Sequence, residues 1–393
     1  MIEVRALAEA EFRASHDLFR RALLLPPVKD EDWPRGSGRY ELGRVHGAFD
    51  GGELAGTAMA TTNELAVPGG RVPAGAVTGV GVRADRTRRR VLRGLMRAQL
   101  DDVRQRGEPV AMLHASEATI YERFGYGVAS RHRKVELERA RVVFREDAPR
   151  GGEVRVLDWE AAEPLLPEIY QRCGIDRPGQ IGRDKAWWSG MRQYLGDGCL
   201  IAVHTGEDGV DDGFAVYEPK RGELAVLDVH DMKTADATAA AQLWRFLLGV
   251  DLVDRVVGHV RPLDDPLEWW LTDRRRCAVT EVEDDLWVRL VDVLAALRAR
   301  TFGAAEPVVV EVRDEFLPDN AGCYRIGPDG VERSTAEPQL GLDVATLGAL
   351  YLGDQLMSAL VAAGRVEVRD PAAIADADRL FATLETPWCG TGF

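Results

Sequence analysis

The sequence predicts an α/β (α+β) protein with more than one domain, in which helices cover mixed β-sheets. Size is the first reason: a chain of 393 residues, 46% of them hydrophobic, is long enough for about two or three packed cores. Second, strand and helix patterns alternate along most of the chain. Third, the order of strand, loop and helix over residues 77–100 returns over residues 224–248, which predicts a duplicated fold.

Residues 1–150 are expected to form the first domain, a mixed sheet flanked by helices. A hairpin turn at 50–52 joins two of its strands, and the Pro- and Gly-rich stretch 26–38 is expected to be a loop. Apolar residues at helical spacing predict helices over 12–23 and 91–100. The expected strands are 3–5, 44–49, 53–61, 75–82, 109–113 and 134–137.

Two further domains are expected after a linker at 150–152. The second, residues 151–285, repeats the strand, loop and helix order of the first but carries no arginine cluster in its loop, so only the first copy is expected to perform chemistry. The third domain spans residues 286–393 and contains a helix-rich stretch over 342–364. The expected elements of the second domain are helices over 161–172 and 236–248 and strands over 199–204, 213–218 and 223–229. Those of the third are strands over 307–314 and 322–326.

Charge and cysteine content exclude several classes of protein. With 64 acidic and 50 basic residues the net charge is −14 at pH 7, so binding to nucleic acid or to a membrane surface is not expected. No stretch resembles a signal peptide or a run of 18 apolar residues, which predicts a cytoplasmic protein. The five cysteines have no C-x-x-C spacing, so neither a disulfide framework nor a metal site is expected.

Arginines cluster between a predicted strand and the predicted helix over 91–100. Five of them lie within residues 86–93, at the positive end of the helix dipole, where each cation costs roughly 0.3–1 kcal/mol unless an anion compensates it. Exposed N–H groups, the dipole and guanidinium groups together form a phosphate site. We therefore expect an anion site here, with a solvated arginine surface as the alternative.

The segment 116–127 follows the next predicted strand and contains two tyrosines. Ser116 is placed to cap a short helix that glycines terminate. Tyr121 and Tyr126 are both compatible with core packing in which the hydroxyl is hydrogen-bonded.

The chain ends in an apolar segment, residues 387–393, whose last residue is Phe393. Most chain ends are polar and frayed. This composition indicates that the tail is tucked into the protein, with simple docking onto the core as one explanation.

Taken together, these blocks resemble the Eis (enhanced intracellular survival) branch of the Gcn5-related N-acetyltransferases. The resemblance covers essentially the whole chain and is more specific than any single block. It is carried by residues 76–82, the arginine loop, residues 113–117, 120–127, 187–188, 264–267, 286–293 and 351–353, and Phe393.

The resemblance implies two tandem acetyltransferase-like mixed-sheet domains followed by a C-terminal sterol-carrier-like α+β domain. It implies a homo-oligomer, namely a hexamer. It also implies that the protein moves acetyl from acetyl-CoA to a primary amine of a small molecule, such as an aminoglycoside, without a metal.

Site residues follow from the same resemblance. Tyr121 is expected to protonate the leaving thiolate, and the C-terminal carboxylate of Phe393 is expected to act as general base. Trp33, in the loop after the first helix, is a candidate for the acceptor side of the site, with aromatic core packing as the alternative, and Trp388 is a further candidate for substrate binding. The residues expected to hold CoA are Val80, Gly81, Val82, Thr87, Arg88, Arg89, Arg90 and Ser116.

Acid–base chemistry agrees with these roles. An acceptor amine has a pKa near ~10, so it must lose a proton before or during attack on the thioester, whereas the departing thiolate gains one. A carboxylate can accept the proton of the amine, and a phenol can donate a proton to the thiolate.

The arginine loop departs from the Arg/Gln-x-x-Gly pattern of the family. Thr87 occupies the first position and Arg90 stands where glycine is expected. Three functions therefore stay open: an acetyl-CoA-dependent amine acetyltransferase, an enzyme on the same scaffold that uses another acyl-CoA or no CoA, and a non-catalytic protein that binds a small molecule.

Overall fold

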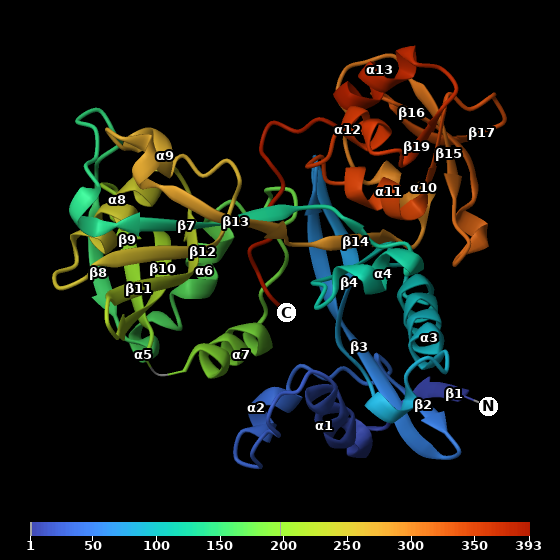
Figure 1. Cartoon of the computed structure of the whole chain (residues 1–393), viewed down its shortest axis with the longest axis horizontal. Helices are drawn as coiled ribbons and strands as arrows, with labels where there is room; N and C mark the ends of the chain where they lie inside the picture. Colours follow the sequence, from blue (N-terminus) through green and yellow to red (C-terminus); the bar gives the residue numbers. More distant parts are fainter. Residues whose placement is uncertain (1, 197) are drawn as a thin grey trace. The chain divides into compact units, whose positions relative to one another are not determined.

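The computed structural model describes residues 2–196 and 198–393, which divide into two compact units (Figure 1). The first unit contains residues 2–130, 286–387 and 391–393, and the second contains the rest. Within these described residues, no helix is both long and apolar enough to cross a membrane.

The first unit contains a seven-stranded sheet with the order β1-β2-β3-β4-β5-β14-β6. All neighbours are antiparallel except β4 and β5, which run parallel. The mixed sheet predicted for this region is therefore confirmed. The strands are β1 (Ile2–Ala6), β2 (Val45–Asp50), β3 (Glu53–Val67), β4 (Gly70–Val82), β5 (Val110–Leu113), β6 (Gly127–Val128) and β14 (Trp287–Leu290).

Helices α1 (Phe12–Ala22) and α3 (Val91–Gln105) match the two helices expected in this sheet. The apolar face of α3, including Leu95 and Leu100, is buried in one cluster with residues of the sheet. The stretch 26–38, expected to be a loop, contains a short helix. Proline is tolerated in its first turn because the missing N–H has no partner there. The short helices are α2 (Trp33–Ser37) and α4 (Ala118–Tyr121).

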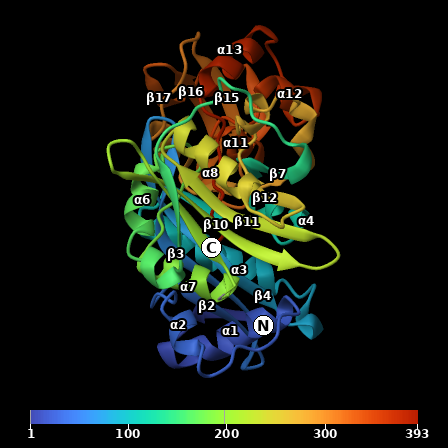
Figure 2. The ribbon, with the colours of Figure 1, turned by 90° about the vertical axis from the view of Figure 1, so that its left-hand side faces the viewer.

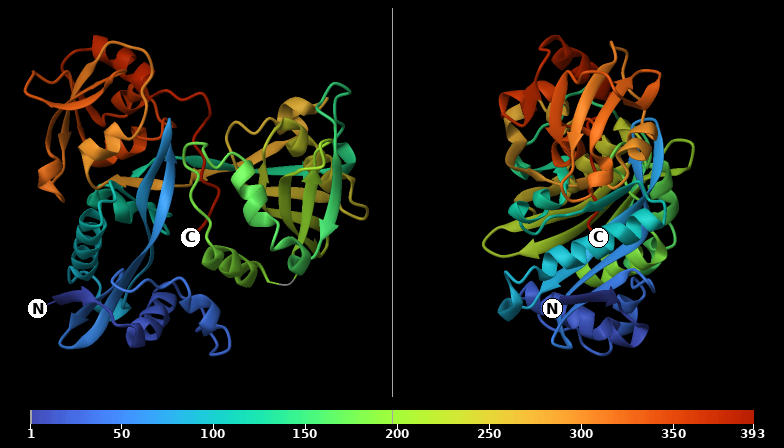
Figure 3. Two further views of the ribbon diagram at one scale, coloured as in Figure 1. Left: turned by 180° about the vertical axis from the view of Figure 1, so that it is seen from behind. Right: turned by 90° about the vertical axis from the view of Figure 1, so that its right-hand side faces the viewer.

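A third sheet, drawn in orange in Figure 3, also belongs to the first unit. Its order is β17-β16-β15-β18-β19, and β15 and β16 match the two strands expected over 307–314 and 322–326. The strands are β15 (Val308–Arg313), β16 (Gly322–Gly327), β17 (Gly330–Ser334), β18 (Leu340–Asp343) and β19 (Val366–Val368). The helices are α10 (Val293–Arg298), α11 (Val344–Leu350), α12 (Met357–Ala362) and α13 (Ala372–Phe381).

The second unit is a seven-stranded sheet with the order β13-β7-β12-β11-β10-β9-β8. Its strands are β7 (Arg131–Glu138), β8 (Glu153–Leu157), β9 (Leu200–Thr205), β10 (Asp211–Arg221), β11 (Ala225–Thr234), β12 (Arg255–Arg261) and β13 (Ala278–Asp284). Its helices are α5 (Trp159–Ala162), α6 (Leu166–Arg172), α7 (Lys185–Leu195), α8 (Ala237–Gly249) and α9 (Leu267–Trp270).

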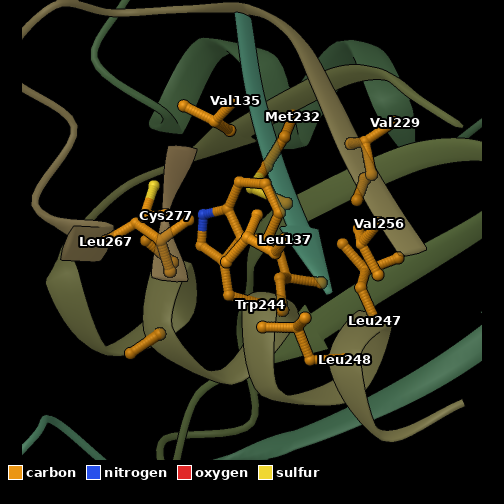
Figure 4. Packing of buried hydrophobic residues seen from close by; sticks show 14 of the residues in the cluster. Val135, Leu137, Val229, Met232, Trp244, Leu247, Leu248, Val256, Leu267 and Cys277 are labelled. Carbon is orange, nitrogen blue, oxygen red and sulfur yellow. The ribbon is translucent and has the colours of Figure 1, made fainter. Parts of the chain in front are cut away.

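Helices cover both faces of this second sheet. On one face α8 packs against the strands (Figure 2), and its Trp244 is fully buried between Leu137 and Val256 of two strands (Figure 4). A separate cluster around Tyr170 and Trp188 fills the other face under α6 and α7. This two-sided burial explains why the strands are apolar on both faces.

Two strands lie in different sheets from those expected. The strand expected over 134–137 as part of the first sheet is β7, which pairs with β12 and β13. Residues 287–290, expected at the start of the third domain, form β14, which pairs with β5 and β6 of the first sheet. Alternation of apolar residues identifies a strand but not its partner, which depends on which sheet edge is free.

Candidate active site

Strands β4 and β5 separate in the middle of the first sheet. They pair only between residues 74–76 and 110–112, although β4 continues to Val82. A β-bulge at Gly79 and Val80 lies between the pairs that Thr78 and Gly81 make with β3. Among the described residues, no strand pairs with Val80–Val82 on the β5 side. An extended ligand can therefore form backbone hydrogen bonds along this open edge.

A cleft of about 810 Å³ opens at this edge. It extends from the end of β4, past the arginine loop, to the start of α3 and the segment that carries Tyr121. The end of α1 contributes Leu23 and Leu24, which the sequence interpretation did not include. The predicted CoA-site residues that line the cleft are Val80, Gly81, Val82, Thr87, Arg88, Arg90 and Ser116.

The arginine loop keeps a glycine-like backbone without glycine. Arg88 and Arg90 have φ values of 62° and 65°, in the left-handed region that costs a residue with a side chain about 1–2 kcal/mol. Arg90 is the N-cap residue of α3. Strained residues of this kind cluster at functional sites. The sequence could show that glycine is missing at residue 90, but not that the left-handed conformation is retained.

The N-terminus of α3 is open to an anion. The cap residue makes no side-chain hydrogen bond, and the first turn holds no acidic residue, so its N–H groups have no capping partner from the helix itself. Arg86 and Arg89 both pair with Asp50, at 3.3 and 3.1 Å. Arg88 and Arg90 form no ion pair with any residue that the structure describes, so their guanidinium groups are available for a ligand in the cleft.

Tyr121 lies on the wall of the cleft, at the end of α4. Its ring is 6.0 Å from that of Tyr126 in an edge-on arrangement, and only 6% of the residue is exposed. Burial raises the pKa of the Tyr121 hydroxyl. The phenol therefore holds its proton at neutral pH, as a general acid must.

The last residue, Phe393, lies beside the ends of β4 and β5. Thr78 donates a hydrogen bond of 3.2 Å from Oγ1 to the Phe393 oxygen, and the Phe393 ring is 4.9 Å from the ring of His114. The same histidine is 2.9 Å, through Nε2, from the carbonyl oxygen of Thr391. Thr78 and His114 both lie in blocks that carry the family resemblance, but no role was expected for either residue.

Four predicted residues, Phe393, Arg89, Trp33 and Trp388, are not among the residues that line this cleft. Arg89 is held by Asp50 and is absent from the lining residues. Trp33 packs with His16 and Tyr40 at ring distances of 5.3 and 5.6 Å, in an aromatic cluster beside α1. Trp388 is buried in the second unit.

Models of known protein families match most of the chain. Residues 3–129 and residues 179–290 each match an acetyltransferase (GNAT) domain, and residues 293–390 match a sterol carrier protein domain. The predicted fold class, with two acetyltransferase-like parts and a sterol-carrier-like part, is therefore confirmed.

Similar proteins identify the family. N-acetyltransferase Eis of Mycobacterium bovis is 34% identical over 86% of this chain and 85% of its own length. The chain belongs to the Eis family of N-acetyltransferases. A protein of Streptomyces avermitilis named as an uncharacterized N-acetyltransferase is 36% identical over 100% of this chain and 99% of its own. The crystal structure of Eis1 from Mycobacterium abscessus matches with a TM-score of 0.90 and 38% identity, covering 100% of both chains.

The cleft lies in the region of the chain that matches the first acetyltransferase domain. This Eis-family chain is an N-acetyltransferase, and its GNAT-matched residues 3–129 contain the open edge of β4, the N-terminus of α3 and Tyr121. The second GNAT-matched region, residues 179–290, has Asp236 at the start of α8, where the first has Arg90 at the start of α3.

Proposed function

We propose that this enzyme transfers acetyl from acetyl-CoA to a primary amine of a small molecule in the cleft of the first unit. The observation that carries the proposal is the coincidence of an unpaired strand edge, an open helix N-terminus with two unpaired arginines, and a buried phenol around one cleft.

The cleft fits the parts of CoA. The start of α3, with Arg88 and Arg90, suits the pyrophosphate because N–H groups, helix dipole and guanidinium groups all favour an anion. The open edge of Val80–Val82 suits the amide groups of pantetheine, which hydrogen-bond as an added strand does. Ser116 lines the same cleft near Tyr121.

Two groups of the chain itself handle the protons. As the amine nitrogen bonds to the acetyl carbon and the carbon–sulfur bond breaks, Tyr121 donates its proton to the departing sulfur. A protonated amine loses two protons over the whole reaction: the carboxylate of Phe393 accepts one, and the other returns to Tyr121. The net charge of −14 favours a cationic acceptor, which is the protonated state of most amines at neutral pH.

The direct test is release of free CoA thiol, followed with a thiol reagent, in the presence of acetyl-CoA and a panel of primary amines. Turnover by the wild type is expected, and a variant with two glycines appended after Phe393 should lose at least roughly tenfold in kcat. Equal rates for the two proteins would overturn the role of the terminal carboxylate. Turnover with a longer acyl-CoA but not with acetyl-CoA would instead support a different acyl donor.

A further inference from the structure

In the second unit, every backbone N–H and C=O group of residues 388–390 forms a hydrogen bond with another residue of that unit. Trp388 donates its N–H to the Pro178 oxygen at 2.8 Å and accepts from Gln180 Nε2 at 2.9 Å. A single carboxylate oxygen of Asp285 accepts the N–H groups of Cys389 and Gly390, at 2.8 and 3.1 Å. The Cys389 oxygen accepts from Lys233 Nζ at 3.0 Å, and the Gly390 oxygen accepts from Arg183 at 3.4 Å. We call these five partners, Pro178, Gln180, Arg183, Lys233 and Asp285, the tail clamp.

Lys233 lies at the centre of the tail clamp. Only 2% of the residue is exposed, and its Nζ atom lies 3.6 Å from the centroid of the Trp388 ring. It also donates to Gln180 Oε1 at 3.1 Å. A buried ammonium group is costly unless its donors are satisfied. Gln180, Cys389 and the Trp388 ring together satisfy it, so the lysine and the tail stabilise one another.

Gly390 turns the chain back over the Trp388 ring. Its φ is 56°, and a Cβ atom at this position would lie 2.3 Å from the ring. Glycine is therefore required for the turn. The indole N–H donates to the Val260 oxygen at 3.1 Å, which fixes the ring as well as the backbone.

Residues 391–393 connect the clamp to the carboxylate of Phe393. A fully extended chain of that length spans at most about 10 Å. The residues that fix Gly390 therefore limit the positions that the carboxylate of Phe393 can occupy.

We propose that Lys233 is a positioning residue, which holds Trp388 and Cys389 so that the carboxylate of Phe393 is presented for proton transfer. This inference rests on the proposed role of that carboxylate. Loss of the clamp should leave acetyl-CoA binding intact and should reduce the fraction of molecules whose tail is in place.

The first experiment measures the tail without using activity. Carboxypeptidase A digestion of the full chain, followed by mass spectrometry of the intact protein, reports how often Phe393 becomes accessible. Lys233→Met, which keeps the length of the side chain but removes its hydrogen bonds and charge, should release Phe393 at least about tenfold faster than wild type. Lys220→Met is the matched control, because Lys220 is half exposed on β10 and pairs with Glu218 and Asp228.

The second experiment measures kinetics on the same proteins. Lys233→Met should lower kcat about tenfold with the KM for acetyl-CoA within about twofold of wild type, whereas Lys220→Met should change neither. Should Lys233→Met fail to fold, Gln180→Leu serves instead, since it removes the donor to the Trp388 oxygen and one partner of Lys233.

The outcomes separate the two proposals. Faster release with reduced kcat supports both. Faster release with unchanged kcat supports the clamp but contradicts the catalytic role of the carboxylate. Wild-type rates of release in both Lys233→Met and Gln180→Leu overturn the clamp and leave the role of Phe393 to the tail-extension experiment.

Discussion

The helices α3 and α8 each follow a long strand of their own sheet, yet they begin in opposite ways. At α3 the cap residue is Arg90 in a left-handed conformation, without a side-chain hydrogen bond to the helix. At α8 the cap residue is Asp236, whose side chain accepts a hydrogen bond of 2.9 Å from the Ala239 N–H. The second helix thus receives an anion from the chain, whereas the first receives none from its cap residue.

The strands that precede these two helices, β4 and β11, also differ from one another. Both strands separate from their parallel neighbours, β4 after three residue pairs and β11 after four, but β11 then carries Lys233 near its end. In the second unit that lysine binds residues of the chain's own tail. The comparison shows that the first copy of the duplicated fold keeps an open strand edge and an uncapped helix, whereas the second copy satisfies the corresponding polar groups with its own residues.

Proton transfer gives the largest effect that tests this comparison. Tyr121→Phe removes the proposed acid and should lower kcat by about 10²-fold, since general acid catalysis typically contributes 10²–10⁴-fold. The expected rate for Tyr126→Phe is close to wild type, because the Tyr126 hydroxyl is buried outside the cleft and its loss removes no proton donor from the site. Steady-state kinetics on both variants checks this. Equal losses would assign Tyr121 a packing role only.

Removal of the unpaired arginines should weaken acetyl-CoA binding. A hydrogen bond to a charged group contributes about 1.5–3 kcal/mol, so Arg88→Ala and Arg90→Ala should each raise the Kd roughly tenfold or more. Arg89→Ala is the control, since that side chain pairs with Asp50 and does not line the cleft. Isothermal titration calorimetry measures all three. A larger effect from Arg89 than from Arg88 and Arg90 would contradict the proposed anion site.

Arg90→Gly separates backbone strain from ligand binding. Because glycine adopts positive φ without a penalty, this variant should be more stable than Arg90→Ala by about 1 kcal/mol while binding acetyl-CoA no better. Urea unfolding and calorimetry on the two variants test both statements. A Kd restored to the wild-type value by glycine would show that the backbone, and not the guanidinium group, binds the ligand.

The pH dependence of stability reports on Lys233 in the second unit. Burial lowers the pKa of Lys233 to about 7 from a usual value of 10.5. Between those two values the unfolded chain retains a proton that the folded chain has released, so raising the pH favours the folded state. The free energy of unfolding of wild type should therefore rise relative to that of Lys233→Met between pH 7 and pH 10. A constant difference across that range would mean that Lys233 stays protonated in the fold.

The smallest effect concerns the cap of α8. Asp236→Ala should destabilise the protein by about 1 kcal/mol, because the Ala239 N–H loses its partner. Acetyl-CoA affinity should not change. Thermal unfolding and calorimetry on this variant check the two statements together, and a changed Kd would mean that the start of α8 also contributes to the ligand site.

Much of the first unit could be predicted from sequence. The helical spacing of the apolar residues predicted α3, and the arginines expected at its N-terminus lie there. Both features are local, because they depend on residues within a few turns of one another.

Features that depend on distant parts of the chain could not be predicted. The pairing of β14 with β5 joins residues far apart in sequence, and so does the contact of Lys233 with Trp388. The sequence showed that Trp388 is an apolar residue near the chain end. Its contact with Lys233 could not be predicted, because lysine is usually exposed and Lys233 is buried. The division of the arginines into paired and unpaired ones depends on Asp50 at the end of β2, which is more than 30 residues from Arg86 and Arg89 in sequence.

The stoichiometry of acetyl-CoA binding tests the central claim most directly. Calorimetric titration of the full chain with acetyl-CoA should give one site per chain, because α3 begins with an open N-terminus beside Arg88 and Arg90, whereas the N-terminus of α8 is capped by Asp236. Binding should weaken at least roughly tenfold in the Arg88→Ala Arg90→Ala double variant. Two sites per chain, or no binding at millimolar acetyl-CoA, would contradict the account.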